Sequence, residues 1–127
     1  MKVILTNEES LEYFHNALCN AVGTGYMQGY SLELTYSEDE YKLAKDKLTT
    51  PCYEDVLIQI LKDGGSLTFT DLEGDDENTK SITIDDVYAK VQNVPFEHLS
   101  DMINGTDDAS TADIILQIVF YDTIIFG

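Results

Sequence analysis

The chain has 127 residues, of which 24 are acidic and 7 basic, so its formal net charge at pH 7 is −17. This charge argues against proteins that hold nucleic acids or anionic membranes, because both kinds of binding depend on lysine and arginine contacts to phosphate groups. Apolar residues make up 43% of the chain, which is enough for one hydrophobic core at this length. We therefore expect a single domain over residues 1–127 that binds neither directly.

No basic stretch followed by an apolar one opens the sequence, so we expect no signal peptide. The longest apolar stretch, residues 114–126, is interrupted by Gln117, Asp122 and Thr123 and is shorter than the roughly 20 residues that span a bilayer. These features predict a soluble protein of the cytoplasm.

The first half of the chain predicts a strand, a helix, a strand and a helix. Residues 1–5, "MKVIL", form a short β-type run, and Thr6 with Glu9 then matches the capping box that begins a helix. The glycines of residues 23–29 end this helix, and residues 30–36, "YSLELTY", alternate as a half-buried strand does. Ser37 caps a second helix, with acidic residues first and lysines last.

The second half predicts a helix, a β-hairpin and three more helices. A helix follows Pro51 and ends at Gly64-Gly65, and residues 66–84 read as two strands joined by a charged loop. The pattern as a whole predicts an α+β fold. Its small, mostly antiparallel sheet (N-terminal strand, strand 30–36, hairpin 66–84) packs against about five helices, and the last helix is central because apolar residues cover half its circumference.

Five carboxylates gather in the loop of this hairpin, namely Asp71, Glu73, Asp75, Asp76 and Glu77. An EF-hand loop counted from Asp71 would need glycine at its sixth position and glutamate at its twelfth, but Asp76 and Ile82 stand there. A looser cation site that includes Asn78 is an alternative to a solvated hairpin tip. We take the five carboxylates as the candidate site for a basic partner.

Candidate residues for chemistry are few. Cys19 lies in a helical apolar pattern and Cys52 at a helix start, and we expect both to be packing residues. The alternative is that Cys52 is reactive, because a helix N-terminus can lower the pKa of a thiol. An enzyme would need a concave pocket that gathers His15 or His98 with carboxylates. The chain has no glycine-rich phosphate loop, nucleophile elbow or HExxH helix. We expect no enzymatic activity, no metal and no cofactor.

Eight tyrosines and no tryptophan are present, and Tyr30, Tyr36, Tyr41 and Tyr53 stand among acidic residues. Such tyrosines either form an amphipathic contact surface or bury their rings at strand and helix boundaries while their hydroxyls remain exposed to solvent.

Residues 52–127 carry a resemblance to a known group. The segments "CYEDVLIQILKDGGSLTFTDLEG" and "KSITIDDVYAKVQNVPFEHLSDMINGTDDASTADIILQIVFYDTIIFG" are similar to small acidic proteins of unassigned function from tailed phages of gut bacteria of the Bacteroidetes type. The resemblance implies a phage or prophage origin and synthesis in the cytoplasm of a bacterial host. It implies no catalytic or binding residues.

Together these features predict a non-enzymatic phage accessory protein that binds a basic protein partner through an acidic surface. A DNA mimic that inhibits a host nucleic-acid-binding or defence protein is the leading form of this hypothesis. One alternative is a virion or assembly component that forms homo-oligomers through the apolar segment 118–127. Another is an immunity-type protein against a basic toxin.

Overall fold

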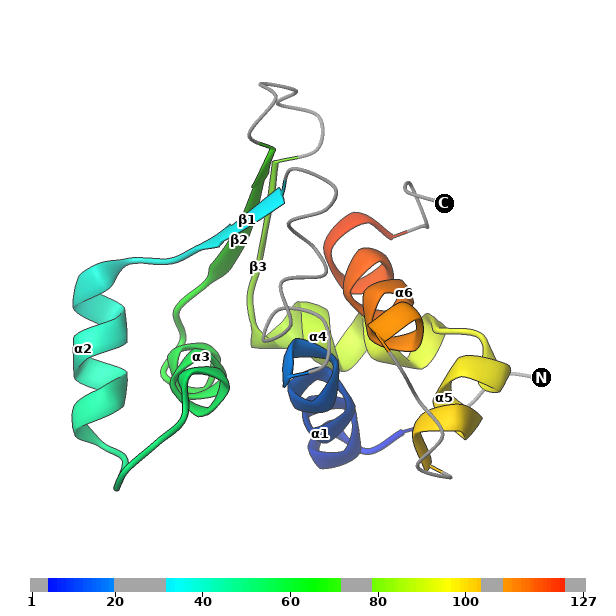
Figure 1. The fold of residues 1–127 in the computed structure, drawn as a ribbon, viewed down its shortest axis with the longest axis horizontal. Helices are drawn as coiled ribbons and strands as arrows, with labels where there is room; N and C mark the ends of the chain where they lie inside the picture. The colour runs from blue at the N-terminus through cyan, green and yellow to red at the C-terminus, as the bar shows by residue number, and fades with distance from the viewer. Residues whose placement is uncertain (1–4, 20–31, 72–78, 104–108, 123–127) are drawn as a thin grey trace.

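A computed structural model of the protein describes residues 5–19, 32–71, 79–103 and 109–122 (Figure 1). Within these ranges six α-helices, one short 3-10 helix and three strands follow one another. In chain order they are α1 (Asn7–Ala17), β1 (Leu32–Thr35), α2 (Glu38–Asp46), α3 (Tyr53–Lys62), β2 (Leu67–Asp71), β3 (Lys80–Ile82), α4 (Ile84–Lys90), η4 (Val91–Asn93), α5 (Phe96–Ile103) and α6 (Ala109–Tyr121).

The three strands form one antiparallel sheet in the order β1-β2-β3. Alternate residues of a strand point to opposite faces, and in β2 the side chains of Leu67 and Phe69 are buried while Thr68 between them is half-buried. On the other face the hydroxyls of Thr68 and Ser81 lie 2.6 Å apart and join β2 to β3. The predicted hairpin and the predicted strand within residues 30–36 are both confirmed.

Helix starts follow the predicted capping signals. The backbone N–H of Glu9 donates to the Thr6 hydroxyl at 3.1 Å, and the N–H of Thr6 donates to the Glu9 carboxylate at 3.0 Å, so both halves of the capping box are present. The side chain of Ser37 accepts from the N–H of Glu40 at the start of α2. The local sequence therefore sets where α1 and α2 begin.

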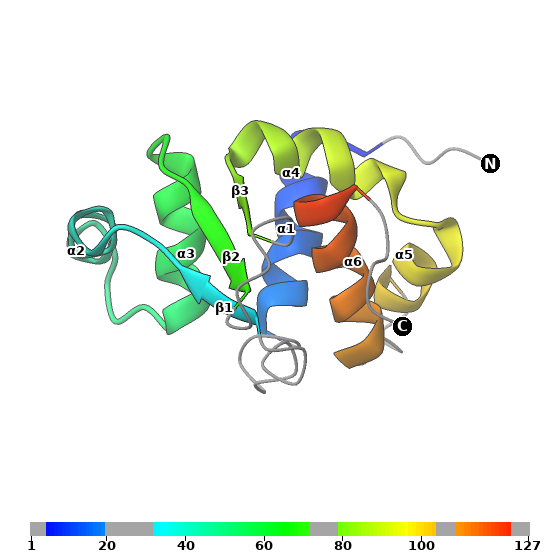
Figure 2. The ribbon, with the colours of Figure 1, turned by 90° about the horizontal axis from the view of Figure 1, so that it is seen from above.

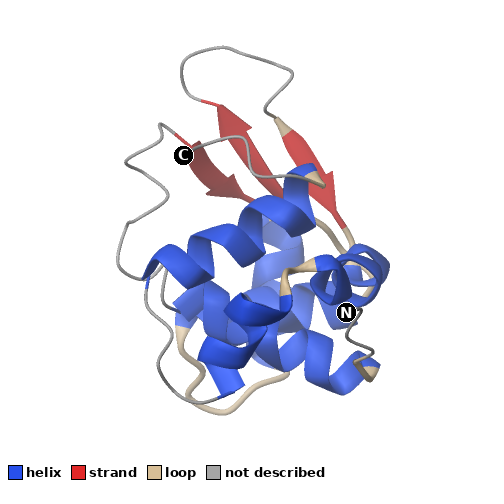
Figure 3. Cartoon of the chain, turned by 90° about the vertical axis from the view of Figure 1, so that its right-hand side faces the viewer, coloured by secondary structure: helices blue, strands red, loops and turns tan. Residues whose placement is uncertain are grey.

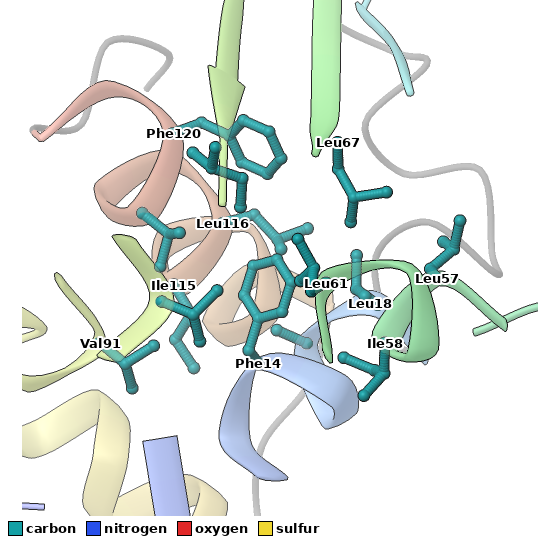
Figure 4. Packing of buried hydrophobic residues seen from close by; sticks show 14 of the residues in the cluster. Phe14, Leu18, Leu57, Ile58, Leu61, Leu67, Val91, Ile115, Leu116 and Phe120 are labelled. Carbon is teal, nitrogen blue, oxygen red and sulfur yellow. The ribbon is translucent and has the colours of Figure 1, made fainter. Parts of the chain in front are cut away.

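One buried apolar cluster takes side chains from all six described α-helices and from β2 and β3. Within it, the ring centroid of Phe120 in α6 lies 4.3 Å from that of Phe69 in β2 and 6.4 Å from that of Phe14 in α1. Figure 4 shows Phe120, Leu116 and Ile115 of α6 on one side of this cluster and the α3 residues Leu57, Ile58 and Leu61 on the other. The last helix is therefore central, as its sequence predicted.

The protein has an α+β fold in which helices gather below one end of the small sheet (Figure 3). The elements predicted in chain order include six helices, about five of them packed against the sheet, and the described residues contain six α-helices. The predicted N-terminal strand falls almost wholly on residues 1–4, outside the described ranges, and Leu5 is in no strand. Among the described helices none is long and apolar enough to cross a membrane.

Candidate functional site

A groove of about 840 Å³ lies between α1, α3, α4 and the connection from α2 to α3. Helix α1 packs against both α3 and α4 (Figures 1 and 2). The α3 wall consists of Asp55, Ile58, Gln59 and Lys62, a spacing that puts all four on one helical face. The α1 wall consists of Asn7, Glu8, Leu11, Glu12 and His15. The volume is within the range of natural ligand sites.

The floor and the rim of this groove differ in chemistry. Ile58 is buried, and Leu11 and Ile84 are half-buried and pack on the hydrophobic core, so the floor is aliphatic. Glu8 and Glu12 are exposed on the α1 side of the rim, and Asp55 and Lys62 are exposed on the α3 side. The lining therefore carries three exposed carboxylates and one exposed lysine. The groove thus combines an apolar surface with exposed negative charge, which suits a ligand that has both apolar and cationic groups.

At one end of the groove α1 and the N-terminus of α3 bring three reactive side chains together. Nε2 of His15 lies 2.9 Å from Oδ1 of Asp55, across 40 residues of sequence. The backbone N–H of Cys52, the N-cap residue of α3, donates to Oδ2 of the same Asp55 carboxylate at 3.3 Å. The ligand atoms of His15, Cys52 and Asp55 all lie within 4.8 Å of one another.

Hydrogen bonds set the charge state of this cluster. Bonds from the Cys52 thiol, from the Cys52 backbone N–H and from the His15 ring hold the pKa of Asp55 below its usual value. The N–H of Asp55 lowers the pKa of Cys52, but the carboxylates of Asp55 and Glu54 accept from its thiol and, on balance, the pKa of Cys52 is raised. Asp55 is therefore a carboxylate at neutral pH, and Cys52 is a thiol.

The raised pKa bears on the alternative of a reactive cysteine. A catalytic cysteine acts as a thiolate and is activated by a neighbouring base or cation. Here His15 and Cys52 both bond to the same carboxylate, and the acidic neighbours of Cys52 disfavour its thiolate. Burial likewise raises the pKa of Cys19, and the charge of Glu54 adds to the effect. The arrangement does not favour nucleophilic chemistry, although a pocket with a histidine and carboxylates is present.

Within the described ranges, the structure does not bring all the site residues predicted from the sequence together. Asp71 ends β2, where it pairs with Leu32 in β1, while the other four loop carboxylates (Glu73, Asp75, Asp76 and Glu77) lie outside the described residues. His15 and His98 each have their own carboxylate, since His98 lies 3.6 Å from Glu97. The prediction that both cysteines are packing residues is wrong for Cys52, which is exposed.

Three of the four tyrosines that stand among acidic residues in the sequence form a cluster beside α2. The ring centroids of Tyr36 and Tyr41 lie 5.1 Å apart in a stack, and that of Tyr53 lies 6.1 Å from each. Tyr36 and Tyr41 are half-buried against the core, whereas Tyr53 is 37% exposed. The three rings thus pack α2 and α3 against the end of β1, which is the alternative in which tyrosines bury their rings at element boundaries. Tyr30 lies outside the described residues.

Sequence reasoning did not find the groove or the contact between His15 and Asp55. The signal that could have marked Asp55 is its position three residues after Cys52, the same spacing as in the Thr6–Glu9 capping box. Nothing local marks His15 as its partner. Comparison with known protein families, curated proteins and solved structures found no match for this chain.

Proposed function

We propose that this chain is a non-enzymatic binding protein that takes a basic, partly apolar segment of a partner protein into the groove between α1, α3 and α4. The observation that carries the proposal is the chemistry of the groove, in which exposed carboxylates stand above an aliphatic floor. The net charge of −17 would raise the rate of encounter with a basic surface. Burial of apolar side chains on Leu11 and Ile84 would then supply affinity.

The partner class that we favour is a nucleic-acid-binding protein of a bacterial host, because its binding channel is basic. In this form the chain is a DNA mimic whose carboxylates occupy the positions of phosphates. An immunity-type protein bound to a basic toxin would use the same groove chemistry. The resemblance of residues 52–127 to phage proteins supports action in the host cytoplasm.

Assembly through the apolar segment 118–127 receives less support. Ile118, Val119 and Phe120 are buried in the core of their own chain and so cannot contact a second copy in this fold. Residues 123–127 of the segment lie outside the described ranges.

A peptide selection tests the proposal and does not require an identified partner. Random peptides displayed on a surface are selected against the purified chain, and we expect the recovered peptides to be enriched in lysine, arginine and apolar residues. Their affinities are then measured for the groove variant Glu8→Gln/Glu12→Gln. Since each exposed ion pair contributes about 0.2–1 kcal/mol, we expect the loss of two pairs to weaken binding by about twofold to thirtyfold.

The matched control is Glu38→Gln/Asp39→Asn, which changes the net charge equally at two exposed residues of α2 outside the groove. We expect less than about a twofold loss for this control, because distant exposed charges are largely screened by salt. Equal losses in the two variants would show that only net charge matters. Recovered peptides without basic residues would contradict the proposal altogether.

A further inference from the structure

His15, Cys52 and Asp55 offer one nitrogen, one sulfur and one oxygen within 4.8 Å of one another. They come from two helices that pack together, with His15 near the end of α1 and the other two at the start of α3. We propose that these three side chains form a binding site for a zinc ion, independently of the proposed binding of a protein segment.

The geometry needs little change to hold the ion. Zinc bonds of about 2.0–2.3 Å in a tetrahedral arrangement place neighbouring donor atoms about 3.3–3.7 Å apart. Nε2 of His15 and Oδ1 of Asp55 are 2.9 Å apart, so they need to separate by only a few tenths of an ångström. The sulfur of Cys52 already lies within 4.8 Å of a ligand atom of His15 and of Asp55, and because the residue is exposed there is room for its side chain to turn toward the ion.

The Asp55 carboxylate is already oriented for this role. Its Oδ2 accepts the backbone N–H of Cys52, and this leaves Oδ1 directed at His15. A hydrogen bond to the second oxygen of a ligating carboxylate is the usual support of a metal ligand. The ion would take the place between Oδ1 and Nε2, where the hydrogen bond now lies.

The mixture of donors selects the metal. Calcium and magnesium take oxygen ligands almost exclusively, whereas zinc accepts imidazole, thiolate and carboxylate together. Cys52 is a thiol in the free protein, so its proton is released to solvent as the Zn–S bond forms. The side chains of His15 and Asp55 are 31% and 47% exposed, so the ion has access from solvent. Three protein ligands leave a fourth position for water or for a donor atom of a bound molecule.

Cobalt titration of the full chain tests the site, since Co²⁺ occupies zinc sites and reports a thiolate ligand by a charge-transfer band in the near ultraviolet. The protein is kept reduced with a phosphine and freed of metal with a chelator. We expect the band to saturate at one Co²⁺ per chain, Zn²⁺ to abolish it, and excess Ca²⁺ to leave it unchanged. Absence of the band would overturn the proposal.

Variants locate the ion. Cys52→Ser keeps a good helix N-cap and should remain folded; we expect it to lose the band and to bind Zn²⁺ at least about tenfold more weakly, because even outer-shell changes cost that much. His15→Gln should weaken Zn²⁺ binding to a similar extent. The controls are His98→Gln and Cys19→Ser, which change the other histidine and the other cysteine of the chain. Cys19 lies close enough to Cys52 and Asp55 for their charges to act on it, so its variant also tests whether the second thiol is a ligand. We expect both controls to bind Zn²⁺ as the wild type does.

A second readout separates loss of the site from loss of the fold. Zinc should raise the Tm of the wild type but not that of Cys52→Ser, because a ligand stabilises only the state that binds it. If Cys52→Ser retains wild-type zinc affinity, the ion sits among other carboxylates and the proposed site is wrong. Loss of binding in Cys19→Ser with retention in Cys52→Ser would also overturn it.

Discussion

Replacement of Phe120 by alanine tests how the sheet is held on the helices. Phe120 is 2% exposed, and its ring contacts Phe69 of β2 and Phe14 of α1. Truncation of a buried phenylalanine costs about 3–5 kcal/mol, so we expect the free energy of unfolding to fall by about 4 kcal/mol. For 127 residues the entropy of unfolding is about 0.27 kcal/mol/K, so the Tm should fall by about 15 °C.

Urea denaturation followed by circular dichroism measures this loss, and Phe120→Leu serves as the control because it keeps most of the buried volume. We expect Phe120→Leu to cost less than about 2 kcal/mol. A double-mutant cycle with Phe69→Leu isolates the contact between the rings, for which we expect a coupling of about 0.5–1.5 kcal/mol. A loss below about 1 kcal/mol in Phe120→Ala, together with zero coupling, would refute the packing of α6 against β2.

Three further predictions concern single side chains. Ser10 is fully buried and its hydroxyl has no hydrogen-bond partner among the described residues. Ser10→Ala should therefore raise the free energy of unfolding, measured by urea denaturation, by about 1 kcal/mol. A decrease in the free energy of unfolding would mean that the hydroxyl is hydrogen-bonded. A Cβ atom on Gly65 would lie 2.5 Å from Oε2 of Glu40 and 2.8 Å from Cγ2 of Ile60. Gly65→Ala should therefore lower the free energy of unfolding by about 1–3 kcal/mol, and an unchanged Tm would contradict this crowding. Burial, followed by the hydrogen bond with Tyr36, raises the pKa of Tyr53, so Tyr53→Phe should remove a step at unusually alkaline pH from a spectrophotometric tyrosine titration. An unchanged titration curve would contradict this. Because the folded-state pKa of Tyr53 is the higher one, its contribution to stability is present below the unfolded pKa near 10 and is lost as the pH rises through the folded value.

Elements whose signals are local were predictable. The capping residues Thr6 and Ser37 stand where the structure begins α1 and α2, because the unpaired N–H groups of a first helical turn need an acceptor. The N-cap hydroxyl accepts from the N–H three residues later, so donor and acceptor are close in sequence. Leu67 and Phe69 alternate with threonines in the sequence, which is the pattern of a half-buried strand, and the structure buries both side chains. In each case the residues that interact are only a few positions apart.

The candidate site was less accessible to sequence reasoning. In the sequence, the residues of its aliphatic floor cannot be told from the core-facing residues of any amphipathic helix. Ile58 and Leu11 also pack toward the core. Cys52 was expected to be a packing residue because no histidine lies near it in the sequence. It is instead exposed at the N-cap of α3, where the backbone has not yet entered the helix. The shape of a groove depends on how far apart packed helices stand, and periodicity does not encode that distance.

Composition and local patterns were enough to define the fold class, most helix boundaries, the hairpin and the acidic character of this protein, because these follow from contacts within a few residues or from residue counts alone. The meeting of His15 with Asp55 and the groove enclosed by α1, α3 and α4 emerge only when the helices pack. The contact spans 40 residues and exists because apolar faces on α1 and α3 bury each other. Hydrophobic burial is not directional, so it brings these polar groups together without leaving a local sign of their pairing.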